Sequence, residues 1–83
     1  MEVAAQVSLY PLRQAGLSPA IERALAIFRE HGLKVTPGTM STLVSGGHDT
    51  VFEALKQAFQ VTAEQGEIVM VVTLSNACPV RGG

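Results

Sequence analysis

The residues able to support acid–base or metal chemistry are few and scattered. The two histidines are His31 and His48, and His48 precedes Asp49 directly. Adjacent residues rarely direct their side chains at one ion, and no third ligand stands nearby, so we expect no metal site. His31 lies at the predicted end of a helix, where a cation complements the helix dipole. The single cysteine, Cys78, lacks the base or helix start that activates a thiol. The sequence therefore predicts no catalytic residue.

Hydroxyl groups are more promising candidates, because they could bind a ligand. They occur at Ser8 and Tyr10, and again at Ser41, Thr42 and Ser45. Such groups can hydrogen-bond a neutral heterocycle without reacting with it, although they are also ordinary strand residues. The second group lies between the only Pro-Gly pair and the first Gly-Gly pair, in a stretch with helical patterns on both sides. We expect this stretch to form a central hairpin that holds a small ligand.

Hydrophobic periodicity and turn residues predict the elements that position these groups. Strands are expected at 2–12, 33–36, 39–45 and 67–75. One helix should run from Ser18-Pro19 to Gly32, with its apolar stripe at Ile21, Ala24, Leu25 and Phe28. A second helix, capped by Asp49 or Thr50 and closed by Gly66, should bury Phe52, Leu55, Ala58, Phe59 and Thr62. Gly46-Gly47 should end the third strand, and the nearly continuous apolar run of the fourth predicts burial on both faces.

The order βαββαβ predicts an α+β fold of the ferredoxin-like type, in one domain that covers residues 1–83. Its four-stranded antiparallel sheet has the order 4-1-3-2 and carries both helices on one face. The end of strand one, at Leu9, should then lie beside the start of strand three, at Met40 to Thr42. The fourth strand is an edge, yet it is the most apolar strand. We therefore expect a homodimer or homotetramer that covers this edge or the bare sheet face.

Composition excludes several classes of function. The net charge is −1 and the six basic residues are scattered, whereas nucleic-acid binding usually needs a clustered basic face. No apolar run reaches the roughly 18 residues that span a bilayer, and the N-terminus has no basic region typical of a signal peptide. We expect a soluble cytoplasmic protein that contacts neither nucleic acid nor membrane.

Three blocks occur in order at suitable spacing: Ser8 to Leu12, Met40 to Gly46 followed by Val51-Phe52, and Thr73 to Pro79. Together they resemble the YkoF-like thiamine/hydroxymethylpyrimidine-binding family. The resemblance implies a ferredoxin-like, non-catalytic protein without a cofactor, which binds thiamine or its hydroxymethylpyrimidine part in thiamine salvage or transport. It also implies association as dimers or tetramers.

Carried over position by position, the resemblance implies ligand contacts at Leu9 and Thr42, with Ser41, Ser8 and Tyr10 as second choices. The third block departs from the family pattern, and strand order sets it at the opposite sheet edge. It is therefore either structural or reaches a partner's pocket. Two alternatives stay open. One is a regulatory or oligomerisation module that senses another small metabolite, and the other is a small enzyme that uses His48.

Overall fold

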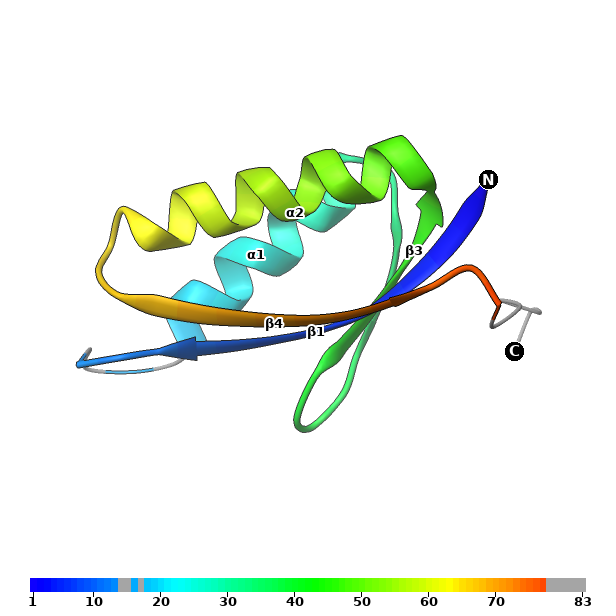
Figure 1. Ribbon diagram of the computed structural model, residues 1–83. Helices are drawn as coiled ribbons and strands as arrows, with labels where there is room; N and C mark the ends of the chain where they lie inside the picture. The colour runs from blue at the N-terminus through cyan, green and yellow to red at the C-terminus, as the bar shows by residue number, and fades with distance from the viewer. Residues whose placement is uncertain (14–15, 17, 78–83) are drawn as a thin grey trace.

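The chain folds into four strands and two helices in the order βαββαβ (Figure 1). The computed structural model describes residues 1–13, 16 and 18–77. The elements are β1 (Glu2–Pro11), α1 (Ser18–Glu30), β2 (Lys34–Pro37), β3 (Thr42–Gly47), α2 (His48–Ala63) and β4 (Ile68–Ser75). The predicted α+β ferredoxin-like arrangement is confirmed.

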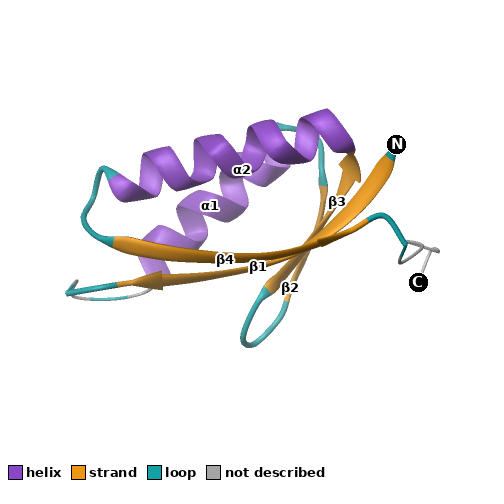
Figure 2. Ribbon diagram, in the orientation of Figure 1, coloured by secondary structure: helices purple, strands orange, loops and turns teal. Residues whose placement is uncertain are grey.

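The strands form one antiparallel sheet in the order β2-β3-β1-β4, and both helices cover the same face (Figure 2). β1 is central, and pairs with β3 from Glu2–Gly47 to Val7–Thr42. On its other side it pairs with β4 from Ala4–Ser75 to Pro11–Ile68. The predicted neighbour relations of the strands are therefore confirmed.

The core lies between the helices and the covered face of the sheet. Alternate residues of β1, Val3, Ala5 and Val7, are buried, as the period of two predicts. Val44 is fully buried on β3, where it pairs with Ala5. The helices contribute Ala24, Ile27, Phe28, Val51, Ala54, Leu55 and Ala58. The buried hydroxyl of Thr62 donates to the Ala58 carbonyl at 2.7 Å, so its burial leaves no unpaired donor.

The end of α1 follows the sequence prediction closely. Gly32 has φ of 77°, which glycine adopts without the penalty that a Cβ imposes. Its N–H donates to the Arg29 carbonyl, and the Leu33 N–H donates to the Phe28 carbonyl. This pair of bonds is the Schellman motif. It ends the helix and turns the chain into β2.

The predicted role of Gly46-Gly47 as a strand breaker is wrong. Both residues belong to β3, which starts later than expected, at Thr42. A Cβ at Gly46 would lie 2.5 Å from Leu33 Cδ2, so this side chain would have to shift within the core. Gly47 is the N-cap of α2, and no side chain caps this helix. The predicted capping by Asp49 or Thr50 is therefore also wrong.

The predicted apolar face of α2 is wrong at its two aromatic residues. Phe52 and Phe59 are 47% and 44% exposed, whereas Val51 and Ala54 are fully buried. The helix is therefore rotated relative to the expected stripe, although Leu55, Ala58 and Thr62 are buried as predicted. A second apolar stripe remains on the surface of α2.

β4 was expected to be buried on both faces, and this is wrong. It is the edge strand next to β1, and five of its eight residues are exposed. Val71 and Leu74, on opposite faces, are 50% and 38% exposed. A continuous apolar run normally marks a strand that is covered on both faces. β4 therefore has more apolar side chains than the rest of this chain covers.

Candidate functional site

A cavity opens where β1 and β3 separate. Their pairing ends at Val7–Thr42, while β1 continues to Pro11 and the chain before Thr42 turns away into the β2–β3 hairpin. A space of about 80 Å³ remains between this hairpin, the end of β1 and α1. It could hold several waters, and it is smaller than a complete pocket for a drug-sized ligand.

The register shows which backbone groups of β1 face this cavity. The His48 N–H donates to the Met1 carbonyl on the β3 side, and the Leu12 N–H donates to the Glu67 carbonyl on the β4 side. In an antiparallel ladder, each residue directs both its polar groups to one side, and the side alternates along the strand. Odd-numbered residues of β1 therefore face β3. Leu9 directs its N–H and C=O past the end of β3, toward the cavity.

The hairpin brings its two predicted site residues, Ser41 and Thr42, to the same place as Ser8 and Leu9 of β1. Ser8, Leu9, Ser41 and Thr42 all line the cavity. The Ser41 hydroxyl accepts a bond from Gln6 Nε2 at 3.0 Å, and the Ser8 hydroxyl donates to the Met40 carbonyl at 3.5 Å. These two hydroxyls therefore tie the hairpin to β1. Within the described part of the chain, the Thr42 hydroxyl has no such bond and stays available.

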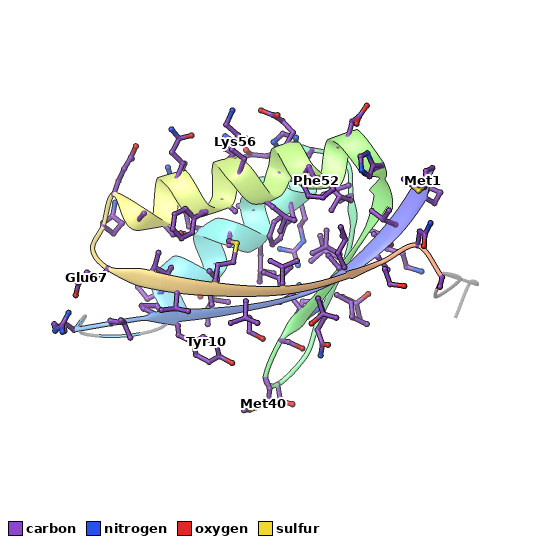
Figure 3. The ribbon with its side chains drawn as sticks, viewed as in Figure 1. Met1, Tyr10, Met40, Phe52, Lys56 and Glu67 are labelled. Atoms are coloured by element: carbon purple, nitrogen blue, oxygen red, sulfur yellow. The ribbon has the colours of Figure 1, made fainter. Side chains whose placement is uncertain are left out.

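Tyr10 is the one predicted site residue that does not reach the cavity. It lies on the uncovered face of the sheet and is 48% exposed. Figure 3 shows its side chain pointing away from the helices, on the same side as Met40 at the hairpin tip. Because neighbours in a strand point to opposite faces, Leu9 and Tyr10 cannot both contact a ligand on the covered face.

The end of the third sequence block lies apart from this cavity. Ser75 pairs with Ala4, whereas Leu9 pairs with Met70. Five residues of strand separate the two positions, which amounts to about 17 Å. None of the described residues 73–77 lines the cavity, although Thr73 pairs with Gln6, next to the Val7–Thr42 pair. Cys78 and Pro79 lie outside the described residues.

The remaining walls of the cavity come from α1, and sequence reasoning did not assign them to the site. They are Ile21, Ala24, Leu25 and Phe28, which face Gly38 and Thr39 of the hairpin. Ile21 and Leu25 are only half-buried, since the sheet beneath them is narrower here. Among the described residues that line the cavity, none carries a charge. The site thus offers apolar walls and a few neutral hydrogen-bonding groups.

The titratable side chains lie elsewhere. His31 Nε2 is 2.7 Å from Gln57 Oε1, and His48 Nδ1 is 3.1 Å from Asp49 Oδ1. No group of three or more metal-ligating side chains occurs in the part of the chain that is described.

A wider surface cleft of about 590 Å³, lined by Arg13, Arg23 and Gln65 among others, lies beside the start of α1. Of the helices described, neither has the length and apolarity needed to cross a bilayer.

Comparison with known proteins places this arrangement in a family. A UPF0045 protein of Methanocaldococcus jannaschii is 34% identical over 58 residues, which are 69% of this chain and 58% of that protein. The matched stretch thus spans little more than half of the relative. The crystal structure of this same relative superposes with a TM-score of 0.86 at 25% identity, over 99% of this chain and 87% of the other.

A second solved structure shares the fold. It belongs to a Thermotoga maritima protein described as a candidate for thiamine biosynthesis or salvage, with a TM-score of 0.80, 19% identity, and coverage of 90% of this chain and 83% of that one. The model of the YKOF-related family matches residues 2–81, nearly the whole chain. The chain therefore belongs to the YkoF-related family.

Proposed function

We propose that this protein is a non-catalytic binding protein for thiamine or its hydroxymethylpyrimidine part, with a role in thiamine salvage or transport. One observation carries the proposal. Leu9 and Thr42 both line one uncharged cavity, although they stand 33 positions apart in the sequence. Both are the positions to which the family resemblance assigns ligand contacts.

The chemistry of the cavity suits an aminopyrimidine. Such a ring has nitrogen acceptors and an exocyclic amine donor in its own plane. The Leu9 C=O can accept from the amine, while the Leu9 N–H and the Thr42 hydroxyl can donate to ring nitrogens. The apolar side chains of Leu25 and Phe28 can contact the faces of the ring. Uncharged walls favour a neutral ring over a phosphate group, which needs basic side chains.

The size of the cavity agrees with partial burial of the ligand. At about 80 Å³ it accommodates part of a ring, and its mouth beside the hairpin is open. We infer that the pyrimidine enters the cavity while the rest of thiamine stays outside it. The membership of the YkoF-related family and the described role of the T. maritima protein support a thiamine-related ligand.

Titration calorimetry with thiamine and with hydroxymethylpyrimidine tests this function. At a protein concentration on the order of 100 μM, a micromolar site gives a clear heat of binding. Binding of both compounds is expected. Binding of an amino acid instead would favour a metabolite-sensing module, and the absence of heat with both pyrimidines contradicts the proposal.

A further inference from the structure

The surface cleft beside the start of α1 is separate from the cavity between the hairpin and β1. It has a volume of about 590 Å³ and lies at the end of the molecule where the start of α1 and the end of α2 come together (Figure 1). α1 contributes Ala20 and Arg23 to the cleft, whereas it contributes Ile21 and Leu25 to the cavity. None of the described residues lines both. The cleft is therefore an independent feature, and its volume falls within the range of small-molecule sites, roughly 300–1,000 Å³.

The cleft brings together two arginines that stand ten positions apart in the sequence. Arg13 and Arg23 are two of the six basic residues in a chain whose net charge is −1. Of the described residues that line the cleft, these two are the only charged ones. The fold thus concentrates positive charge here, although the basic residues are scattered along the sequence. A cleft with charge of one sign attracts ligands of the opposite sign.

Arg23 has no partner for its charge. It makes no ion pair or hydrogen bond to the residues that the structure describes. Side chains three and four positions away are its neighbours on the helix surface, and these are Pro19, Ala20, Ala26 and Ile27. None of them is acidic. The Arg23 guanidinium is therefore available to bind an oxyanion through two parallel N–H groups.

Arg13 is restrained at the cleft by Glu67. Its Nη1 donates to Glu67 Oε1, and the Leu12 N–H donates to the Glu67 carbonyl at 2.9 Å. Among the described residues other than glycine, Arg13 alone has a positive φ, of 56°. Its bond to Glu67 leaves Nε and Nη2 without a partner in the described part of the chain. Glu67 thus offsets part of the charge, and it also lowers the entropy that Arg13 would lose on binding a ligand.

The remaining side chains of the cleft suit the organic part of a ligand. Pro19 and the buried Ala20 are small and apolar. The Thr62 hydroxyl donates its proton to the Ala58 carbonyl, so it shapes the cleft without serving as a donor. The Gln65 amide has no described partner and can donate. The start of α1 adds the partial positive charge of the helix dipole.

We propose that this cleft is a second ligand site, which binds a small organic phosphate with its phosphate group between Arg13 and Arg23. A phosphate group presents three strong acceptor oxygens, so it can accept from both guanidinium groups and from the Gln65 amide. The cleft is larger than a phosphate group alone, which leaves room for an organic group against Pro19 and Ala20. This site does not depend on the proposed pyrimidine site, because the two share no lining residue.

Titration calorimetry with phenyl phosphate at constant ionic strength tests the second site. The wild-type chain should bind one equivalent. Arg23→Gln should raise the Kd by about 10- to 150-fold, because a charged hydrogen bond is lost. Arg29→Gln is the matched control, since it removes the same charge from the same helix but does not line the cleft. It should bind like the wild type. No binding by the wild type, or equal losses in the two variants, overturns the proposal.

Backbone amide shifts of the ¹⁵N-labelled wild type still decide the matter if Arg23→Gln does not fold. Phenyl phosphate should shift the amides of Ala20, Arg23 and Gln65. Benzoate, which has two acceptor oxygens and a single charge, should shift them less at the same concentration. Equal shifts with benzoate, or shifts at the hairpin residues 38–42 instead, contradict the proposal.

Titration with hydroxymethylpyrimidine separates this proposal from the proposed function. Because Arg23 does not line the pyrimidine cavity, Arg23→Gln should keep the wild-type affinity for hydroxymethylpyrimidine while it loses phenyl phosphate. If hydroxymethylpyrimidine fails to bind the wild type, the proposed function fails and the phosphate titration still tests the cleft. A parallel loss of both ligands in Arg23→Gln would show that the cleft is not a separate site.

Discussion

Val7 and Thr42 form the last backbone pair between β1 and β3. Beyond this pair, β1 continues for four residues to Pro11 while the hairpin turns away. Among the described residues, the separation leaves the polar groups of Leu9 without a strand on the β3 side, and it opens the cavity next to α1. The end of the β1–β3 pairing at Val7 and Thr42 thus creates both the space for a ligand and the hydrogen-bonding groups that face this space.

Replacing Thr42 with valine should weaken ligand binding without changing the fold. The two side chains have almost the same shape, and the hydroxyl makes no bond to the described residues that its loss would break. A buried hydrogen bond to the ligand is worth about 1–3 kcal/mol, so calorimetry should show a Kd about 5- to 150-fold higher for hydroxymethylpyrimidine. Thr36→Val, on the uncovered face, is the matched control and should bind normally. Equal affinities of the two variants would remove Thr42 from the site.

Replacing the backbone amide at Leu9 with an ester, which removes its N–H, should lower ligand affinity without lowering the stability of the fold. The Leu9 N–H faces the cavity, so its replacement by oxygen, introduced by semisynthesis, should lower affinity by about tenfold. The same change at Tyr10 removes a hydrogen bond to β4 and should lower the free energy of unfolding by about 1 kcal/mol. The Tyr10 ester should keep its affinity. Titration calorimetry and urea unfolding of both proteins distinguish the two effects, and the opposite pattern would show that the register is misassigned.

Adding a methyl group at the two adjacent glycines of β3 should give unequal results. The new Cβ of Gly46→Ala meets Leu33 Cδ2 at 2.5 Å in the core, and such overpacking costs about 1–3 kcal/mol. At Gly47 the nearest atom, Thr50 Oγ1, is 3.9 Å away. Gly47→Ala should therefore change the free energy of unfolding by less than about 1 kcal/mol. Urea denaturation measures both, and similar losses at the two positions would contradict the packing role of Gly46.

The contact between His31 and Gln57 should contribute modestly to stability. Their side chains lie 2.7 Å apart and join the end of α1 to the middle of α2. Because the contact is exposed to water, His31→Ala should lower the free energy of unfolding by about 0.5–1.5 kcal/mol. Thermal unfolding of His31→Ala, Gln57→Ala and the double variant measures the coupling. If the two single effects add without coupling, the contact does not stabilise the fold.

Much of the fold was predictable because its signals are local. The alternation in β1, the end of α1 at Gly32 and the order of elements lead to the observed sheet. Strand order alone then placed Leu9 beside the hairpin residues Ser41 and Thr42. The proximity of these residues therefore follows from topology, without any knowledge of side-chain positions.

Other features depend on tertiary packing that no local pattern contains. Apolar residues recur at helical spacing on two faces of α2. Periodicity alone could therefore not show that Val51 is buried while Phe52 is exposed. Ile21 and Leu25 followed the expected core stripe, but the narrowing sheet turns them into cavity walls. No local pattern shows why glycine stands at position 46. The reason is the Leu33 side chain, which a Cβ at this position would meet in the core.

Nuclear magnetic resonance shows where hydroxymethylpyrimidine binds, and we expect it between β1, the hairpin and α1. Hydroxymethylpyrimidine is added to ¹⁵N-labelled protein, and backbone amide shifts are followed. Binding in this cavity predicts saturable shifts at Leu9, at the hairpin residues 38–42 and along 24–28 of α1. Shifts confined to the cleft around Arg23 and Gln65, or no shifts at millimolar ligand, would contradict it.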